Sequence, residues 1–184
     1  MKDASTPRRF RRPDVPAIVH DVLAPLVGLQ GHVAGHALDM LWIHFGDEVE
    51  VRVPPTRPPR RMGEWALHVM GAWRLIWPPR IITSGRDFYV QADSGEPLDW
   101  EVGGECRFDR RIEVFNRDVE AHVRRVESVD VDPVGGFSLR FDNDHQLDVF
   151  PDSTLLDDED WRLFRPGSNG EHFVFPETVF QDGD

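Results

Sequence analysis

The feature that most constrains the fold is a two-residue alternation of apolar and polar side chains, which recurs in short stretches along the chain. Such alternation is typical of strands with one buried face, because successive side chains point to opposite faces of a sheet. It is clearest at Leu41, Ile43 and Phe45, and again at Leu139 and Phe141. Turn residues separate the stretches, and we therefore expect a β-rich α+β protein built from antiparallel sheets.

The alternation also predicts how the strands follow one another. Val49, Val51 and Val53 follow Phe45 across the polar residues 46–48, which is typical of a β-hairpin. Residues 137–149 predict a second hairpin within an antiparallel meander. The other expected strands lie at 65–76 with a break near Gly71, at 81–90 in one or two pieces, and at 129–131, 161–164 and 172–175.

Two stretches show the three- and four-residue spacing of a helix instead. The first is formed by Val15, Ile18, Val19, Val22, Leu23 and Leu26. Asp14 is placed to cap this N-terminal helix, and Pro25 should end or kink it. The second, formed by Phe108, Ile112, Phe115 and Val119, predicts a central amphipathic helix over 108–122 that packs on a sheet.

A chain of 184 residues is long enough to bury one sizeable core without disulfides. Four arginines in the first dozen residues, without a periodic apolar pattern, predict a mobile basic arm over 1–13. Residues 14–184 are expected to form a single globular domain. Within it we expect one β unit over 36–92, the central helix over 108–122 and a second β unit over 123–180.

A short motif links the two expected β units. Trp73-Arg74-Leu75-Ile76-Trp77-Pro78 and Trp161-Arg162-Leu163-Phe164-Arg165-Pro166 are identical at four of six positions. We interpret the units as related, each opening with a hairpin and finishing with a Trp-Arg-Leu strand, with Trp73 and Trp161 in equivalent buried places. The alternative is a coincidence among strands of similar composition.

The same residues carry a family resemblance that covers roughly residues 38–175. The stretches that carry it are Ala66-Leu67-His68-Val69, Trp73-Arg74-Leu75, Ser84-Gly85-Arg86-Asp87, Leu147-Asp148-Val149-Phe150-Pro151 and Trp161-Arg162-Leu163-Phe164. In these stretches the chain resembles small uncharacterised bacterial proteins, some of which resemble immunity proteins of contact-dependent or polymorphic toxin systems. The resemblance implies a fold and an immunity-like role, and it transfers no catalytic residue.

Charge is distributed very unevenly along the chain. The net charge is -12, but residues 1–92 carry +3 and residues 93–184 carry -15. Such a field favours a basic protein partner and disfavours nucleic-acid binding, although it also serves solubility. We take Asp157, Asp158, Glu159 and Asp160 as the partner-binding residues, because four like charges repel one another and should not stabilise the fold.

Cysteine usage and hydropathy indicate the compartment. Cys106 is the only cysteine, which excludes an intramolecular disulfide and the Cys-rich zinc frameworks. We find no apolar stretch of signal-peptide length near the N-terminus and no run of about 18 apolar residues anywhere. We therefore expect a cytoplasmic protein that does not span a membrane.

One histidine pair has metal-ligand spacing. His32 and His36 are four residues apart and Asp39 is three further on, which on a helix would place all three on one face. Gly31 and Gly35 argue against that helix. The alternative function, a small metal-dependent hydrolase, would use these three residues, but we expect no metal and no cofactor.

Other patterns select no catalytic group. Asp142, Asp144 and Asp148 lie close together as in a calcium loop, but Leu147 and Ser153 occupy the places of its glycine and its glutamate. Cys106 lies in no nucleophile motif, and the chain contains neither a G-x-S-x-G elbow nor a phosphate-binding loop. The leading hypothesis is thus a non-enzymatic interaction protein that binds a basic partner through its acidic second half.

Overall fold

The computed structural model describes residues 13–52, 58–99, 105–168, 170 and 172–180, and of residues 118–121 only the backbone. Apart from Pro13, the predicted basic arm lies outside this part of the chain. The strands are β1 (Gln30–Ala37), β2 (Met40–Val51), β3 (Arg60–Val69), β4 (Ala72–Trp77), β5 (Arg80–Ser84), β6 (Arg124–Val131), β7 (Phe137–Phe141), β8 (Gln146–Phe150), β9 (Trp161–Phe164) and β10 (Phe173–Phe175).

All ten strands belong to one antiparallel sheet, in the order β10-β9-β3-β2-β1-β6-β7-β8-β4-β5. The helices among the described residues are α1 (Val15–Leu23), α2 (Arg107–Ala121) and α3 (Glu177–Phe180), with 3₁₀ turns η1 (Ala24–Leu26) and η2 (Gly85–Tyr89). The expected β-rich α+β class with antiparallel pairing is confirmed. No helix in this part of the chain is both long and apolar enough to cross a bilayer.

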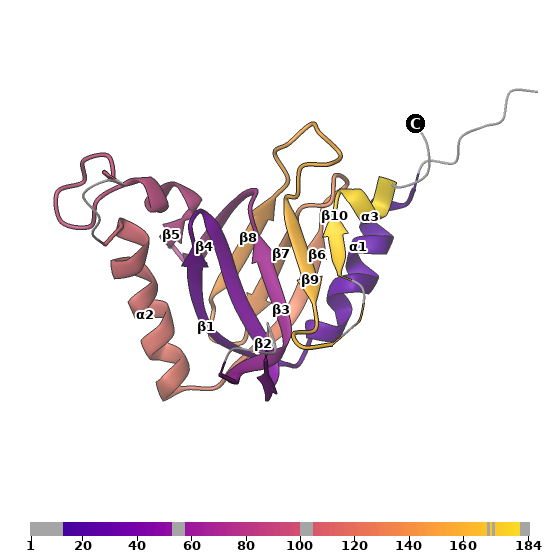
Figure 1. Cartoon of the computed structure of the whole chain (residues 1–184), viewed down its shortest axis with the longest axis horizontal. Helices are drawn as coiled ribbons and strands as arrows, with labels where there is room; N and C mark the ends of the chain where they lie inside the picture. Colours follow the sequence, from indigo (N-terminus) through magenta and orange to yellow (C-terminus); the bar gives the residue numbers. More distant parts are fainter. Residues whose placement is uncertain (1–12, 53–57, 100–104, 169, 171, 181–184) are drawn as a thin grey trace, which may run out of the picture.

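Two helices lie on opposite sides of the sheet structure (Figure 1). α2 packs against β1 and β5, and α1 packs against β6. The Asp14 side chain accepts a hydrogen bond from the backbone N–H of Ala17, so the cap predicted for α1 is present. Phe108, Ile112 and Phe115 of α2 are buried. Each helix therefore covers one side of a common core.

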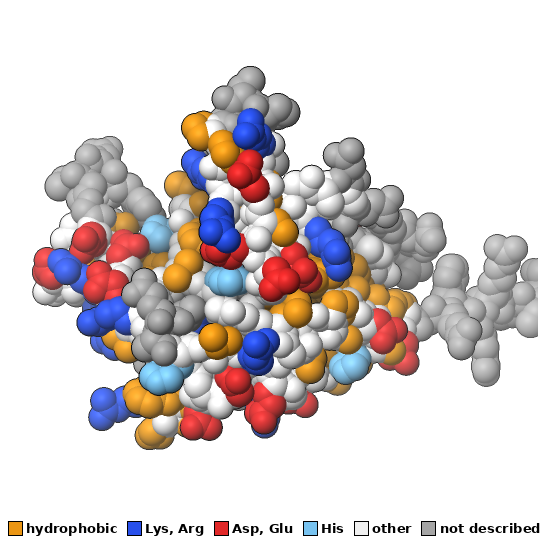
Figure 2. All heavy atoms as spheres, turned by 90° about the horizontal axis from the view of Figure 1, so that it is seen from below, with side chains coloured by type: hydrophobic (Ala, Val, Ile, Leu, Met, Phe, Trp, Pro, Cys, Tyr) orange, Lys and Arg blue, Asp and Glu red, His pale blue; other side chains and the backbone are white. Residues whose placement is uncertain are grey.

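Three of the connections between strands lie together at one end of the structure. The β1–β2 turn at Asp39, the β3–β4 turn at Gly71 and the loop 151–160 between β8 and β9 lie at one end, which we call the loop end. β2 and β9 run from there to the opposite end. Figure 2, seen from below Figure 1, shows acidic, basic and apolar side chains mixed over that opposite end.

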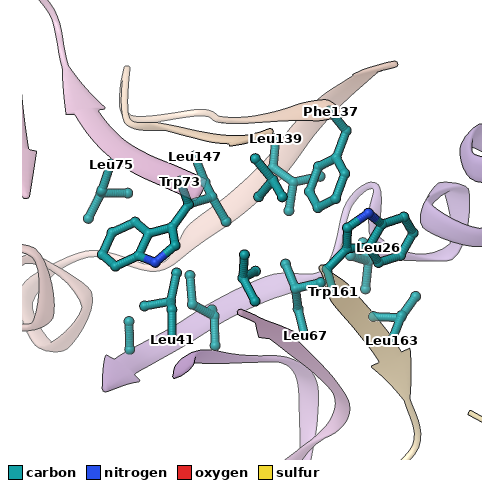
Figure 3. Packing of buried hydrophobic residues seen from close by; sticks show 14 of the residues in the cluster. Leu26, Leu41, Leu67, Trp73, Leu75, Phe137, Leu139, Leu147, Trp161 and Leu163 are labelled. Atoms are coloured by element: carbon teal, nitrogen blue, oxygen red, sulfur yellow. The ribbon is translucent and has the colours of Figure 1, made fainter. Parts of the chain in front are cut away.

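The core lies inside the bend of the sheet, between a side that carries β4 and β8 and a side that carries β2 and β3 (Figure 3). Trp73, Leu75 and Leu147 project from β4 and β8 toward Leu41 and Leu67 on β2 and β3. Burial of such side chains stabilises the fold by about 25 cal/mol for each Å² of apolar surface removed from water. Trp73 and Trp161 are both buried, as predicted.

The hairpin predicted across residues 46–48 is wrong, because β2 continues through them to Val51 as one strand. The pairing with β3 shifts between Phe45 and Glu48, which marks a bulge. Gly46 has φ of +81°, and a Cβ there would lie 2.4 Å from Cγ of Glu64. Glycine and polar residues suit a bulge as well as a turn, so the sequence pattern did not distinguish the two.

Two further expectations need correction or refinement. The stretch 65–76 breaks at Met70 and Gly71, as predicted, but its two pieces lie in different parts of the sheet: β3 pairs with β2 and β9, and β4 with β5 and β8. After β5 the chain forms η2 instead of continuing as a second strand. The reason is a capping box, in which Ser84 and Asp87 bond each other's backbone N–H groups.

The strand order has a symmetry in its connectivity. Exchanging β1–β5 with β6–β10 gives the same order read from the other end. In each half the last hairpin pairs with the other half: β4 with β8, and β9 with β3. Trp73 is opposite Val149 and Trp161 is opposite Val69, so the two motif strands lie in matching registers.

Candidate functional site

The loop 151–160 projects from the loop end of the molecule (Figure 1). It presents Leu155 and Leu156, whose exposed fractions are 60% and 50%. Asp157 and Asp158 follow directly and are exposed as well. Two large apolar side chains and two carboxylates thus share one protruding surface.

Asp160 fastens the base of this loop to the fold. It is 2% exposed, and its backbone N–H donates to the carbonyl oxygen of Phe175 at 3.0 Å. Its carbonyl oxygen accepts from the N–H groups of Met70 and Gly71, both at 2.8 Å, and its Oδ1 accepts from the N–H of Asp152 at 3.1 Å. Burial raises the pKa of the Asp160 carboxyl group.

Glu159 is also engaged with the fold. Its two carboxylate oxygens accept hydrogen bonds from Nε and Nη2 of Arg162, and both side chains are partly buried. The expectation that all four acidic residues meet a partner is therefore corrected. Asp160 is buried and holds the loop, Glu159 pairs within the chain, and of the four only Asp157 and Asp158 are exposed.

Hydrogen bonds inside the loop fix its shape. The Ser153 hydroxyl donates to Oδ2 of Asp158 at 2.9 Å and accepts from the N–H of Leu155 at 3.1 Å. The N–H of Asp158 donates to the carbonyl oxygen of Leu155 at 3.3 Å. These bonds hold Leu155 and Asp158 in a defined geometry at the tip.

A hollow of about 420 Å³ adjoins the loop at Asp152. Ile81, Tyr89 and Phe150, three exposed large side chains with apolar surface, contribute to its lining. Its charged residues are of both signs: Asp39, Arg74, Arg86 and Asp152. The hollow and the loop together offer apolar surface bordered by charge, which is a common composition for a protein interface.

The carboxylates of the suggested calcium loop do not converge. Asp148 accepts hydrogen bonds from Arg74 Nε at 2.8 Å, from the Ser138 hydroxyl at 2.6 Å and from Gln146 Nε2 at 2.5 Å. Burial opposes ionisation of Asp148, but these bonds outweigh it and lower the pKa. Asp142 instead accepts from the N–H of Arg125. The β7–β8 hairpin is present as predicted.

His32, His36 and Asp39, the ligands of the alternative metal-dependent function, are not brought together either. His32 and His36 lie on strand β1, where four residues span about 13 Å. Nε2 of His32 lies 2.5 Å from the carbonyl oxygen of Gly46, and the Asp39 carboxylate accepts from the Tyr89 hydroxyl at 3.3 Å. The hydrolase built on these three residues is therefore not supported by the geometry.

Two strand histidines have altered acid–base properties. Burial and the neighbouring His32 lower the pKa of His44. Burial, together with Arg162, His44 and His172, lowers the pKa of His68 to about 4. Both imidazoles are thus neutral near pH 7, which favours a role in packing over a role in acid–base catalysis.

Sequence reasoning missed the exposed leucines and one side-chain cluster. Leu155 and Leu156 were not recognised as surface residues, because an apolar pair is more often buried. Cys106 lies within reach of His36 and Asp109, a contact across about 70 positions that no local spacing reveals. Burial raises the pKa of the Cys106 thiol to about 11, so it is no ready nucleophile.

Comparison with known proteins gives no identification. No family model matches the chain, and no curated protein and no solved structure matches it.

Proposed function

We propose that this chain is a non-enzymatic interaction protein that binds a basic protein partner through the loop 151–160 and the adjoining hollow. The observation that carries the proposal is the exposure of Leu155 and Leu156 on a loop with a fixed shape. Each leucine side chain gains roughly 1.5–3 kcal/mol when it is fully buried. Because the two side chains are 60% and 50% exposed in the free chain, a partner that covers them would gain about half of this free energy.

The loop is already ordered before a partner binds. Its base is held by Asp160 and its tip by the Ser153–Asp158 hydrogen bond. Binding then requires little further loss of conformational entropy, which otherwise weakens association by about 0.5–1.5 kcal/mol per immobilised side chain. A preorganised tip with apolar anchors favours recognition of another protein.

The charges around the leucines favour a basic partner. Asp157 and Asp158 are exposed next to the leucines, and the second half of the chain carries a net charge of -15. Opposite charge speeds the encounter and orients the partner, whereas apolar contacts slow its release. The hollow carries charges of both signs, with Asp39 and Asp152 beside Arg74 and Arg86, and this pattern favours one orientation of the bound partner.

We further propose that the two halves of the chain are related β units. The symmetric strand order, the matching registers of Trp73 and Trp161 and the shared Trp-Arg-Leu motif support this relation. In the first unit β3 and β4 are joined by two residues, Met70 and Gly71, whereas residues 151–160 join β8 and β9. The fold needs only the short turn, so the ten-residue loop is available for a function.

An immunity-like role is the specific form of this proposal. The resemblance in the Trp-Arg-Leu strands suggests it, and the partner would then be a basic toxin domain. The acidic loop would bind that domain by charge and by its leucines. This form rests on the resemblance, whereas binding through the loop rests on the geometry.

The proposal is tested by placing a photo-crosslinking amino acid at Leu156, and separately at exposed Asp93, in the organism that makes the protein. We expect a basic protein to be crosslinked from position 156 and not from position 93. The crosslinked protein is then produced in pure form and titrated with the wild-type chain and with Leu155→Ser/Leu156→Ser.

The leucine variant should dissociate faster from the purified partner, because it lacks the apolar contacts that slow release. Both leucines are exposed, so their replacement should leave the fold intact. Equal crosslinking from both positions, or an unchanged dissociation rate in the leucine variant, would overturn the proposal.

A further inference from the structure

Three side chains with metal-binding atoms meet where β1 approaches the start of α2. They are His36 on β1, Cys106 just before α2 and Asp109 in its first turn. One nitrogen, one sulfur and one oxygen from these residues lie within 4.8 Å of one another. This cluster is separate from the loop 151–160 and plays no part in the proposed partner binding.

The start of α2 fixes the Asp109 carboxylate. Its Oδ2 accepts from the Cys106 N–H at 2.9 Å, as a residue at this position of a helix often does, and from Cys106 Sγ at 3.2 Å. Its Oδ1 faces Nε2 of His36 at 3.1 Å. The carboxylate thus lies between the sulfur and the imidazole.

Both nitrogens of His36 face oxygen acceptors. Nδ1 is 2.7 Å from the carbonyl oxygen of Leu38, which can only accept, so Nδ1 carries a proton. In a neutral ring Nε2 then has a lone pair directed at the Asp109 carboxylate, which also only accepts. One nitrogen and one oxygen that can both ligate a metal ion therefore face each other at 3.1 Å.

The surroundings of His36 match those of a metal-bound histidine. Such histidines usually donate their second N–H to a backbone carbonyl or a carboxylate, as Nδ1 does here to Leu38. Phe88 stacks on the ring at 5.1 Å between centroids, and Phe108 meets it edge-on at 5.2 Å. The ring is therefore held in one orientation with Nε2 toward Cys106 and Asp109.

The geometry points to a Zn²⁺ site formed by His36 Nε2, Cys106 Sγ and an Asp109 carboxylate oxygen. Zn²⁺ accepts nitrogen, thiolate and carboxylate ligands at about 2.0–2.3 Å in a tetrahedral arrangement, in which neighbouring donor atoms are about 3.3–3.8 Å apart. Asp109 faces His36 Nε2 with Oδ1 at 3.1 Å and Cys106 Sγ with Oδ2 at 3.2 Å. One ligand atom of each residue lies within 4.8 Å of the other two, so the three side chains need to shift by about 1 Å to surround the ion. The ion displaces the proton of the Cys106 thiol, which is released to solvent.

Solvent reaches one side of this cluster. The side chains of His36 and Asp109 are 25% and 35% exposed, whereas Cys106 is buried. A water molecule can complete the tetrahedron from that side, as in zinc sites with three protein ligands. The ion would join β1 to α2 and stabilise the folded chain.

The test uses metal-free protein titrated with Zn²⁺ by calorimetry, and with Co²⁺ followed by the thiolate-to-cobalt absorption band. We expect one equivalent to bind, the cobalt band to appear, and Zn²⁺ to raise the melting temperature. His36→Gln and Cys106→Ser should lose all three effects. His32→Gln and Asp39→Asn are the matched controls and should retain them, because neither residue reaches the cluster.

Three results would overturn the site. They are absence of stoichiometric binding to folded wild-type protein, binding without the cobalt–thiolate band, and loss of binding in His32→Gln. Circular dichroism of each metal-free variant shows whether it folds. If Cys106→Ser does not fold, the cobalt spectrum of the wild type and the His36→Gln titration decide the question.

Discussion

At the scale of single residues, the acidic run divides into two pairs with different tasks. Asp160 and Glu159 are held by the fold, whereas Asp157 and Asp158 are exposed and Asp158 accepts one hydrogen bond from Ser153 within the loop. Replacing each of these four acidic residues should therefore lower the free energy of unfolding by a different amount. A buried carboxylate that accepts a backbone hydrogen bond, as that of Asp160 does from Asp152, contributes to stability, and an exposed one contributes little.

Asp160→Ala should lower the free energy of unfolding by about 2 kcal/mol, because it leaves the Asp152 N–H without its side-chain acceptor and opens a space at the loop base. Asp157→Asn should change it by less than about 0.5 kcal/mol. Urea denaturation of both variants measures the difference. Equal effects would show that Asp160 does not hold the loop.

His68 should make stability depend on pH. Its pKa falls from 6.5 to about 4 on folding, chiefly through burial, so the folded protein binds this proton more weakly than the unfolded chain does. The contribution of His68 to the free energy of unfolding is fully present above pH 6.5 and is lost as the pH falls toward 4. After allowance for solvent screening, the loss is about 1–2 kcal/mol.

The measurement is urea denaturation at several values of pH between 7 and 4, comparing wild type with His68→Gln. The variant should show a shallower decline over this interval, whatever its stability at pH 7. Identical slopes would remove His68 as a source of the pH dependence.

At the scale of elements, the bulge in β2 shapes the strand that the sequence suggested was a hairpin. Gly63 of β3 is opposite the bulge, and a Cβ there would lie 2.5 Å from the Phe45 carbonyl oxygen and 2.7 Å from its nitrogen. These are backbone atoms, so they cannot rotate away. By contrast, Gly28 has a positive φ but open space around it.

Gly63→Ala should therefore cost about 3 kcal/mol of stability, because the strands must separate at the bulge. Gly28→Ala should cost about 1 kcal/mol, from its backbone conformation alone. Chemical denaturation of the two variants compares them directly. If Gly28→Ala is as costly as Gly63→Ala, close packing at the bulge is not what requires glycine.

How far each element could be predicted depended on whether its signal was local. The Phe108–Phe115 spacing gave α2 to within one residue at each end, and the alternation at 137–149 gave β7 and β8, because each pattern reports one buried face. The bulge at Gly46 and the cap at Ser84 use residues that are also typical of turns. The candidate sites depend on tertiary contacts and on exposure, which spacing alone does not encode.

At the scale of the whole molecule, the symmetric connectivity shows where the loop 151–160 departs from its counterpart in the first half. Two halves with the same strand order enclose one core, and each contributes its last hairpin to the other. The loop 151–160 is a ten-residue connection at a place where the other half uses two. In the proposed function it gives the second half a surface that the first half lacks.

In the proposed function, Asp157 and Asp158 guide a basic partner to Leu155 and Leu156. The most direct measurement is the association rate with the crosslinked partner, by stopped flow at several salt concentrations. Asp157→Asn/Asp158→Asn is compared with Asp93→Asn/Glu96→Gln, which removes the same charge from exposed residues of another loop. We predict slower association and a weaker salt dependence for the first pair, with a much smaller change for the second. Equal changes in both pairs, or an unchanged rate in the first, would contradict the account.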